Sequence, residues 1–229
     1  KKQFAILKIR SNLIRLIRKF LDNNDFLNID TPIFTSSSCE GTTNLFETNY
    51  FDKKAYLSQS GQLYNEANIM AFNKVYSFGP TFRAEKSKTR RHLTEFWMVE
   101  PEIAFCSLDE NMDWAEKLIK FVINEIIKEC KDEFQILDKD ILKLHSFVKK
   151  SFPRISYTEA IEIINKNNGD ISWGNDFGSN DETILSNNFN SPVFVHRFPA
   201  SIKAFYMKLD EKNPKLALGM DLIAPQGYG

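Results

Sequence analysis

The sequence predicts an α+β fold, an antiparallel sheet flanked by helices, from three observations. Residues 75–85 and 96–105 are rich in β-branched and aromatic side chains and are joined by a basic stretch, which is typical of a β-hairpin. Apolar residues recur at helical spacing over 4–21 and again over 107–130. Strand-like segments return near the end of the chain, at 192–198, 202–209 and 216–224.

Local signals in the first third of the chain predict the elements between these landmarks. Residues 26–35 favour a strand that is interrupted at Pro32, since proline cannot donate a ladder hydrogen bond. Residues 35–43 are small and polar and predict a loop that carries one acid, Glu40. A strand, a turn at Ser60-Gly61 and a helix towards Met70 are expected next.

The second half of the chain begins with helical signals. Ser107 and Glu110 have the spacing of a capping box, which marks the start of the 107–130 helix. Two further helices are expected at 138–151 and 156–165, before the late strands. Together these segments favour one domain of 229 residues, a length that can bury a substantial core.

Composition limits the classes of function. The chain has 30 Lys and Arg against 30 Asp and Glu, so no global field attracts nucleic acid, and any RNA contact has to be local. Its 3 cysteines, an odd number, show no metal-ligand spacing, which indicates neither a disulfide framework nor a zinc site and points to a reducing compartment. No apolar run approaches the ~20 residues of a membrane span, and Lys1 opens no signal peptide, so we expect no membrane partner and no secretion.

The predicted hairpin carries the chemistry. Arg83 and Glu85 share one face of the outgoing strand, and Phe96, Glu100 and Glu102 share one face of the return strand. Guanidinium groups bind phosphate oxygens, carboxylates bind Mg²⁺ or an amine, and an aromatic ring can stack on a purine. The pattern therefore suits a nucleoside triphosphate beside a cationic amine. A solvated basic loop with a structural Arg–Glu pair is the alternative that these residues leave open.

The order of the hairpin residues resembles a known family. FRAE followed by RHLTEFWMVEPE is similar to motif 2 of the class II aminoacyl-tRNA synthetases, and within them to the bacterial-type asparaginyl enzymes of the aspartyl, asparaginyl and lysyl branch. The helix and the strand with Pro32 resemble motif 1, which implies a homodimer interface around Pro32. SSSCEG, QSGQLYNE and IKAFYM also match the wording of the asparaginyl enzymes.

The resemblance implies a function and its partners. It implies an asparagine–tRNA ligase that uses ATP and Mg²⁺ to form asparaginyl-adenylate and then charges tRNA(Asn) for protein synthesis. Such an enzyme is cytoplasmic or, in a eukaryote, organellar (mitochondrion or plastid). It contributes positioning and charge neutralisation, and no covalent nucleophile.

The resemblance also implies a role for individual residues. Arg83 is the expected catalytic residue, bridging the α-phosphate and the substrate carboxylate. The expected ATP-binding residues are Arg83, Glu85, Arg91, His92, Leu93 and Phe96. The expected asparagine-binding residues are Glu40, Ser60, Gln62, Glu66, Arg83, Glu100 and Lys203. Asp221 is expected to bind Mg²⁺ together with a Glu beyond Gly229.

Specificity for asparagine has a physical basis in QSGQLYNE. Aspartyl enzymes carry QSPQLFKQ, where a Lys suits an anionic side chain, whereas a carboxamide donates from its NH₂ group and needs an acceptor. In this sequence Asn65 occupies the position of that Lys, and Glu66 is the neighbouring acid. Glu66 is therefore expected to accept from asparagine and to repel aspartate.

The resemblance divides the chain into known parts of a class II catalytic domain. Motif 1 covers about 4–35, motif 2 about 75–105, a helical connection about 107–165, and late sheet strands 192–224. Motif 3 and the anticodon-binding domain are not found in the printed chain. We therefore expect the chain by itself not to complete adenylation.

Three alternatives remain at this level. An aspartyl-tRNA synthetase, including a non-discriminating one, is the nearest, and Asn65-Glu66 in place of Lys argues against it. An asparagine synthetase on the same fold would accept ammonia and would not bind tRNA. A non-catalytic dimeric paralogue would keep the fold as a binding module.

Overall fold

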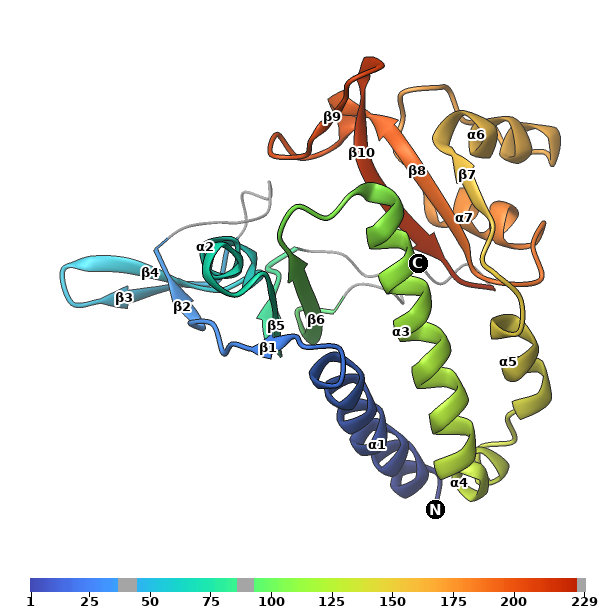
Figure 1. Cartoon of the computed structure of the whole chain (residues 1–229), viewed down its shortest axis with the longest axis horizontal. Coiled ribbons are helices and arrows are strands. Elements are labelled where there is room, and N and C mark those ends of the chain that lie inside the picture. The colour runs from blue at the N-terminus through green and yellow to red at the C-terminus, as the bar shows by residue number, and fades with distance from the viewer. Residues whose placement is uncertain (37–44, 86–92, 226–229) are drawn as a thin grey trace. The chain divides into compact units, whose positions relative to one another are not determined.

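The computed structural model describes residues 1–36, 45–85 and 93–225. The chain forms two compact units, one of Lys1–Ile17 with Ser107–Gly229 and one of Arg18–Cys106. Helix α1 (Lys2–Asp22) begins in the former and ends in the latter. Figure 1 shows the order of the elements along the chain.

In the unit of residues 18–106 the described residues form two three-stranded sheets and one whole helix, besides the end of α1. In one sheet the order is β1 (Leu27–Asn28), β5 (Lys74–Phe82) and β6 (Glu95–Ile103), with β1 parallel to β5 and β5 antiparallel to β6. In the other, β4 (Lys53–Leu57) pairs antiparallel with both β2 (Phe34–Thr35) and β3 (Glu47–Tyr50). Helix α2 (Gln62–Phe72) packs on β5 and β6.

The core of this unit is built on β5, whose residues Val75, Tyr76 and Phe78 are buried. The Tyr76 hydroxyl donates to Asp22 Oδ1 at 2.8 Å, and burial together with this carboxylate raises the pKa of Tyr76 to about 12. Strand β5 is therefore anchored in the core through Val75, Tyr76 and Phe78. The Ser77 hydroxyl of the same strand contacts Glu100 of β6.

The other unit begins with helices that follow residue 107. They are α3 (Leu108–Glu129), α4 (Lys131–Ile136) and α5 (Ile141–Val148). Next come β7 (Arg154–Ser156), α6 (Tyr157–Lys166), α7 (Ser179–Ser186), β8 (Val193–Pro199), the 3₁₀ helix η1 (Ala200–Ile202), β9 (Leu209–Asp210) and β10 (Asn213–Ile223).

One four-stranded sheet organises this unit, in the order β7-β8-β10-β9. Strand β7 is parallel to β8, and β10 is antiparallel to both β8 and β9. Val193 and Val195 of β8 pack in one buried cluster with α6 and α7, whereas Phe194 between them packs in another with Met112 of α3. The alternation of β8 side chains therefore buries both faces of the sheet.

The class of fold expected from the sequence is confirmed, with helices covering sheets whose strand pairs are mostly antiparallel. The β1–β5 and β7–β8 pairs are parallel, which adds a mixed character that the sequence analysis does not predict. The capping box at Ser107 and Glu110 is present, and a second one joins Ser156 and Glu159 at α6.

The first and third helices pack as their apolar periodicity predicts. Leu16 of α1, Ile126 at the end of α3 and Cys130 form a buried cluster. At its rim Lys8 Nζ pairs with Glu133 at 2.6 Å, and Asn12 donates to Cys130 Sγ at 3.2 Å. Cys106 and Cys130 are free thiols, and Cys39 lies outside the described residues.

One predicted strand is wrong. Residues 202–209 do not form a strand: the chain turns through η1 after Pro199, makes a second turn at Phe205 and Tyr206, and pairs with β10 only at Leu209–Asp210. β-branched and aromatic content alone suggested a strand, but the backbone turns before it reaches β10. The Lys203 side chain contacts Asp221 and the Phe198 ring, while only Leu209 and Asp210 pair with β10.

Several elements were not predicted. Strands β3 and β7 and helices α4 and α7 lie in stretches read as loop or as part of a longer helix. The predicted helix at 138–151 is shorter, at 141–148, and is capped by the Asp140 side chain.

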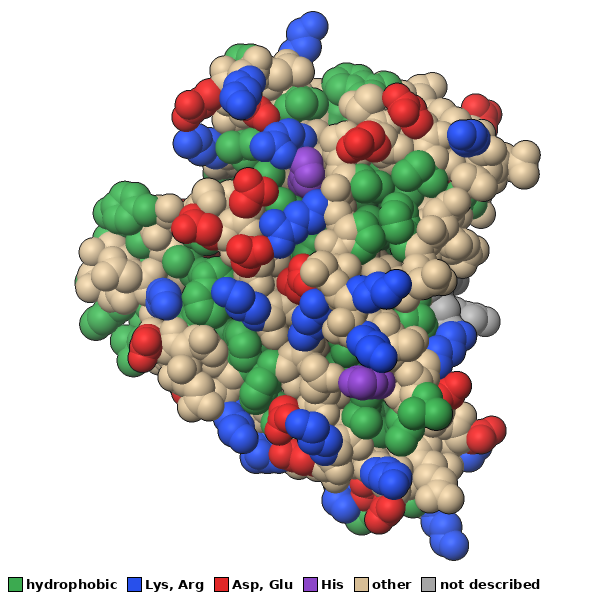
Figure 2. All heavy atoms as spheres, turned by 45° about the vertical axis from the view of Figure 1, so that its right-hand side comes forward, with side chains coloured by type: hydrophobic (Ala, Val, Ile, Leu, Met, Phe, Trp, Pro, Cys, Tyr) green, Lys and Arg blue, Asp and Glu red, His purple; other side chains and the backbone are tan. Residues whose placement is uncertain are grey.

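Among the described residues no helix is both long and apolar enough to cross a membrane. Figure 2 shows acidic and basic side chains together on the face that it presents.

Candidate functional site

Among the predicted site acids that the structure describes, Glu100 of β6 accepts the most hydrogen bonds. Its carboxylate accepts from the Ser60 hydroxyl, from the Gly61 backbone N–H at 3.1 and 3.2 Å, and from the Ser77 hydroxyl at 3.1 Å. Ser77 reaches it because β5 and β6 pair in a register that sets Ser77 opposite Glu100. The structure thus brings Ser60 and Glu100 together and fixes the direction of the Glu100 oxygens.

Gly61 allows this arrangement by close approach. A Cβ at Gly61 would lie 2.6 Å from Thr31 Oγ1 and 2.7 Å from Ser77 Oγ, closer than real Cβ contacts. Because the residue is glycine, its N–H can face Glu100 while α2 begins one residue later. The Ser60 hydroxyl also accepts from the Gln62 backbone N–H at 3.1 Å, so the same turn starts the helix.

Helix α2 presents the predicted specificity residues. Gln62 Nε2 donates to Glu66 Oε1 at 2.8 Å, which brings these two residues together one helical turn apart. Glu66 is exposed, whereas Asn65 is fully buried and accepts from Asn68. Of Asn65 and Glu66, Glu66 is therefore the residue that a ligand can reach.

Glu102 adds a third carboxylate to the same unit. Burial and the negative charges of Glu66 and Glu100 raise its pKa to about 7. Its neighbour across the strand pair is Val75, which brings no charge. Glu66 of α2 and Glu100 and Glu102 of β6 form an electronegative cluster. A substrate ammonium group would offset the repulsion between their charges.

Arg83 follows β5 and lies beside a predicted aromatic partner. Its guanidinium carbon is 5.4 Å from the centre of the Phe96 ring, and its backbone N–H bonds the Thr94 carbonyl at 3.0 Å. The buried Nε has no hydrogen-bond partner among the described residues. A buried guanidinium N–H without a partner is costly, so this position suits an anionic ligand oxygen.

For the other predicted site residues of this unit, the structure gives exposure or surroundings rather than contacts with the site. Glu85 is half-buried and Leu93 is 63% exposed. Pro32 lines a cavity of about 200 Å³ beside Gly61 and Glu100. Glu40, Arg91 and His92 lie outside the described residues.

The other unit brings together Lys203 and Asp221. Lys203 Nζ lies 3.2 Å from Asp221 Oδ2 on β10 and 3.9 Å from the centre of the Phe198 ring. Burial raises the pKa of Asp221, an effect that the Lys203 charge opposes. Lys203 is mostly buried, with 15% of its side chain exposed, while 45% of the Asp221 side chain reaches solvent.

With these two groups of residues described, the family of the chain can be stated. The sequence profile of the tRNA synthetases class II (D, K and N) matches residues 1–228. The chain belongs to this class II synthetase family. The asparagine–tRNA ligase of Desulforamulus reducens is 53% identical to it over 228 residues, which cover 100% of this chain and 53% of that relative.

Solved structures of this class II family agree. The asparaginyl-tRNA synthetase of Pyrococcus horikoshii in complex with asparaginyl-adenylate matches at a TM-score of 0.96 and 42% identity, over 100% of this chain and 52% of that one. An aspartyl-tRNA synthetase of Entamoeba histolytica matches at 0.80 and 31%, over 99% and 44%. The chain spans about half the length of the curated relatives it matches.

In a class II synthetase the metal would be Mg²⁺, and the residues present can be tested for it. The described residues contain no group of three or more His, Cys, Asp or Glu able to hold a metal ion by themselves. Mg²⁺ in nucleotide sites commonly takes only one or two carboxylates, with phosphate and water oxygens as its other ligands. The partly exposed carboxylate of Asp221 fits that limited contribution.

Two groups that contact Glu100 were not predicted from the sequence. Ser77 and the Gly61 N–H both bind Glu100, yet neither is a charged or aromatic residue that attracts attention in a sequence. The β5–β6 register would have revealed Ser77, since a hairpin sets cross-strand partners opposite one another. The Gly61 contact depends on a close approach of Thr31, which no local pattern predicts.

Proposed function

We propose that this chain is the catalytic part of an asparagine–tRNA ligase. The observation that carries the proposal is a pair of carboxylates in one unit: Glu100, fixed by Ser60, Gly61 and Ser77, and Glu66, held by Gln62. One acid suits an ammonium group and the other suits the donor end of a carboxamide. Asparagine carries both groups.

The amino-acid substrate is bound by charge and by donor pattern. Glu100, with Glu40 and Gln62, binds the ammonium group, and Ser60 keeps the Glu100 oxygens in place. Glu66 accepts from the side-chain NH₂ of asparagine and repels the extra negative charge of aspartate. Glu66→Lys would reverse that preference, because a Lys at this exposed position would attract an anion.

The nucleotide is bound by the hairpin residues. Arg83, whose Nε lacks a partner among the described residues, donates to the α-phosphate and to the substrate carboxylate, and Phe96 stacks on adenine. Glu85, Arg91, His92 and Leu93 contribute the rest of the ATP contacts. Asp221 would hold Mg²⁺, which neutralises phosphate charge when bound.

Two balanced steps follow. A carboxylate oxygen of asparagine attacks the α-phosphorus, the bond to the β-phosphate bridge breaks, and pyrophosphate leaves. A ribose hydroxyl of the terminal tRNA nucleotide then attacks the activated carbonyl, loses its proton, and AMP leaves. Arg83 lowers the repulsion between carboxylate and phosphate in the first step, so the protein acts by positioning and electrostatics.

The proposal includes the partners of the reaction. It assigns tRNA(Asn) as acceptor and a homodimer with Pro32 at its interface. Because tRNA is charged where ribosomes work, it places the protein in the cytoplasm or in an organelle that makes its own proteins.

The test is ATP–pyrophosphate exchange by the full-length protein with asparagine, aspartate and lysine in parallel. We expect exchange with asparagine, little with the other two, and loss of exchange by at least about a hundredfold in Arg83→Ala, as for removal of a transition-state donor. Exchange with aspartate alone would make the protein an aspartyl enzyme. Exchange with none of the three would favour a non-catalytic paralogue.

A further inference from the structure

Arg197 has an unusual backbone conformation inside strand β8. Its φ is 59°, in the left-handed region that bulky residues rarely adopt. The β8–β10 pairing is irregular at this point, because two residues of β10, Leu218 and Gly219, lie opposite the single Arg197. A residue keeps such a conformation only where surrounding contacts hold it. The conformation of Arg197 therefore depends on what its side chain contacts.

Two side-chain contacts hold the guanidinium group of Arg197. Arg197 Nε donates to Asp210 Oδ2 at 2.9 Å, and Arg197 Nη1 lies 3.0 Å from His196 Nδ1. A guanidinium group can only donate hydrogen bonds, so Nδ1 of His196 has to be the acceptor. His196 is therefore neutral in this contact and carries its proton on Nε2.

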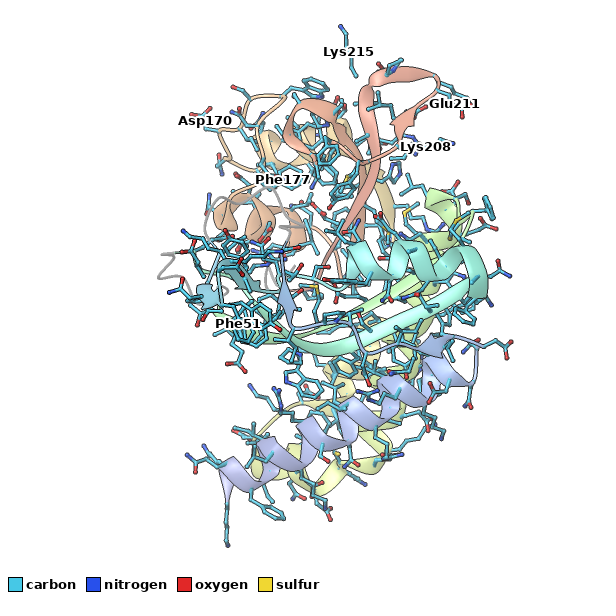
Figure 3. All side chains as sticks on the ribbon, turned by 90° about the vertical axis from the view of Figure 1, so that its left-hand side faces the viewer. Phe51, Asp170, Phe177, Lys208, Glu211 and Lys215 are labelled. Atoms are coloured by element: carbon cyan, nitrogen blue, oxygen red, sulfur yellow. The ribbon has the colours of Figure 1, made fainter. Side chains whose placement is uncertain are left out.

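The Arg197–Asp210 pair anchors β9, an edge strand of only two residues. Because β10 lies between β8 and β9 in the sheet, the Arg197 side chain joins the two outer strands. Only 14% of the Asp210 side chain is exposed. Lys208 and Glu211, which flank β9 and are labelled in Figure 3, form a second pair at 3.3 Å, but this pair is largely exposed and stabilises little. The anchor of β9 is therefore Arg197.

The turn of residues 203–208 is held at both ends. At its start Lys203 Nζ lies 3.2 Å from Asp221 Oδ2, and at its end the Lys208 carbonyl accepts from the Leu218 N–H at 2.7 Å, next to β9. The second attachment lies beside Asp210 and shares its support by Arg197. The order of the turn is thus linked to the neutral form of His196.

The residues that face His196 come from several elements. They are Asp109 of α3, Glu159 of α6, Arg154 of β7 and Arg197 of β8, and the paired residue of β10, Met220, is uncharged. Burial and the Arg197 charge lower the pKa of His196, and Asp109 and Glu159 oppose this effect. The folded protein therefore binds the proton less readily than the unfolded chain, so stability from this contact is present above about pH 6.5 and is lost as the pH falls.

We propose that the His196–Arg197–Asp210 chain of contacts is a pH-sensitive restraint on the turn that carries Lys203. A proton on His196 Nδ1 removes the acceptor of Arg197 and places a second positive charge beside it. Arg197 then loses one of the two contacts that hold its left-handed backbone, and the attachment of β9 weakens. The turn is ordered while His196 is neutral and opens more often in acid.

Hydrogen exchange in the full-length protein tests this restraint. The reporter is the Leu218 amide, whose protection factor is compared at about pH 7.5 and about pH 5, on either side of the ordinary histidine pKa. We expect protection to fall about tenfold in acid, the size of one hydrogen bond. The Cys130 amide, which donates to the Ile126 carbonyl at 2.9 Å, is the internal control and should not change. Unchanged protection at Leu218, or an equal fall at Cys130, would overturn the proposal.

Variants separate the charge of the ring from its size. His196→Asn keeps an uncharged acceptor oxygen near the position of Nδ1, so Leu218 should stay protected at both pH values. Asp210→Asn removes the anion that pairs with Arg197 and should lower protection at both. His145→Asn is the matched control, because His145 is an exposed histidine of α5, and it should keep the wild-type pH dependence. A loss in acid that persists in His196→Asn would contradict the role of His196.

Nitrogen-15 spectra of the wild type give a second test that needs no variant. At neutral pH the His196 ring should carry its proton on Nε2 and leave Nδ1 bare. The doubly protonated ring should appear over the same pH range in which Leu218 loses protection. A proton on Nδ1 at neutral pH would overturn the proposal, because Nδ1 could not then accept from Arg197.

Discussion

Two carboxylates of the candidate site are held in different ways. Glu100 is fixed by two hydroxyls and a backbone N–H, whereas the one hydrogen bond of Glu66 among the described residues comes from the side chain of Gln62. A carboxylate with several donors keeps one orientation and suits a group common to all amino acids. A carboxylate with one adjustable partner can accept from a side chain that varies between substrates, which is why we assign the choice of amino acid to Glu66.

Glu66→Gln tests that assignment. The change keeps the size of the side chain and removes its charge, so it should raise KM for asparagine about tenfold, equivalent to about 1.4 kcal/mol. It should also relax discrimination against aspartate, because the repelling charge is gone. Steady-state pyrophosphate exchange with both amino acids measures both effects.

Glu162→Gln provides the control for this experiment. Glu162 is an exposed glutamate of α6 and is not one of the proposed site residues. Its replacement should leave both amino-acid constants unchanged. If Glu66→Gln behaved like Glu162→Gln, the specificity assignment would be wrong.

Glu102 gives a prediction about pH and stability. Its pKa is raised from 4.5 to about 7 by burial and by Glu66 and Glu100, so between these pH values the folded protein holds a proton that the unfolded chain has released. Stability must therefore fall as the pH rises through this window. Glu102→Gln keeps a neutral side chain, so its unfolding free energy relative to wild type should increase by about 2–3 kcal/mol across the window.

Urea denaturation at several pH values measures this difference. The wild type and Glu102→Gln are compared at each pH, so titrations elsewhere in the protein cancel. A constant difference across the window would mean that Glu102 ionises as an ordinary glutamate.

At the scale of elements, the turn before α2 is where the site and the fold depend on each other. A Cβ at Gly61 would press on Thr31 Oγ1 and Ser77 Oγ, so Gly61→Ala should destabilise the protein by about 1–3 kcal/mol and displace the Glu100 partners. Gly79 of β5 has no atom within 4 Å of its Cβ position, and Gly79→Ala is the matched control. Thermal denaturation of both variants tests the prediction, and equal midpoints would refute it.

Elements with a strong local signal could be predicted from the sequence. Helix α3 combines helical periodicity with the Ser107 capping box, and β5–β6 combines β-branched content with a basic connection, so local and tertiary preferences agree there. The site residues Ser60 and Glu100 could likewise be predicted from the sequence motifs in which they occur. Their contact could not be derived locally, because it depends on the register of β5 and on the position of the turn.

Elements decided by tertiary context were missed. Residues 202–209 have the content of a strand, but Lys203 pairs with Asp221 and only two residues pair with β10, so the segment turns. Strand β3 is exposed along its whole length and carries no alternating apolar pattern. Helix α7 starts in a polar stretch, where the Asp181 side chain accepts from the Gly178 N–H at 2.9 Å. Its apolar anchor is Leu185, which only the packed structure shows to be buried.

At the scale of the whole molecule, the proposed homodimer makes a prediction for Pro32. The cavity beside Pro32 also borders Gly61 and Glu100, so a partner subunit at this surface would lie next to the site residues. We expect the full-length protein to sediment as a dimer and Pro32→Arg to shift it towards monomer with reduced exchange. Full activity in a monomeric wild type would contradict this arrangement.

The central claim is that the protein activates asparagine and rejects aspartate, and competition between the two tests it most directly. The full-length protein is incubated with ATP, magnesium, inorganic pyrophosphatase and equal concentrations of asparagine and aspartate that carry different radiolabels, and the enzyme-bound adenylate is isolated. We expect asparaginyl-adenylate almost alone, and we expect its label to move to tRNA when tRNA is added. Aspartyl-adenylate as the main product, or no adenylate at all, would contradict it.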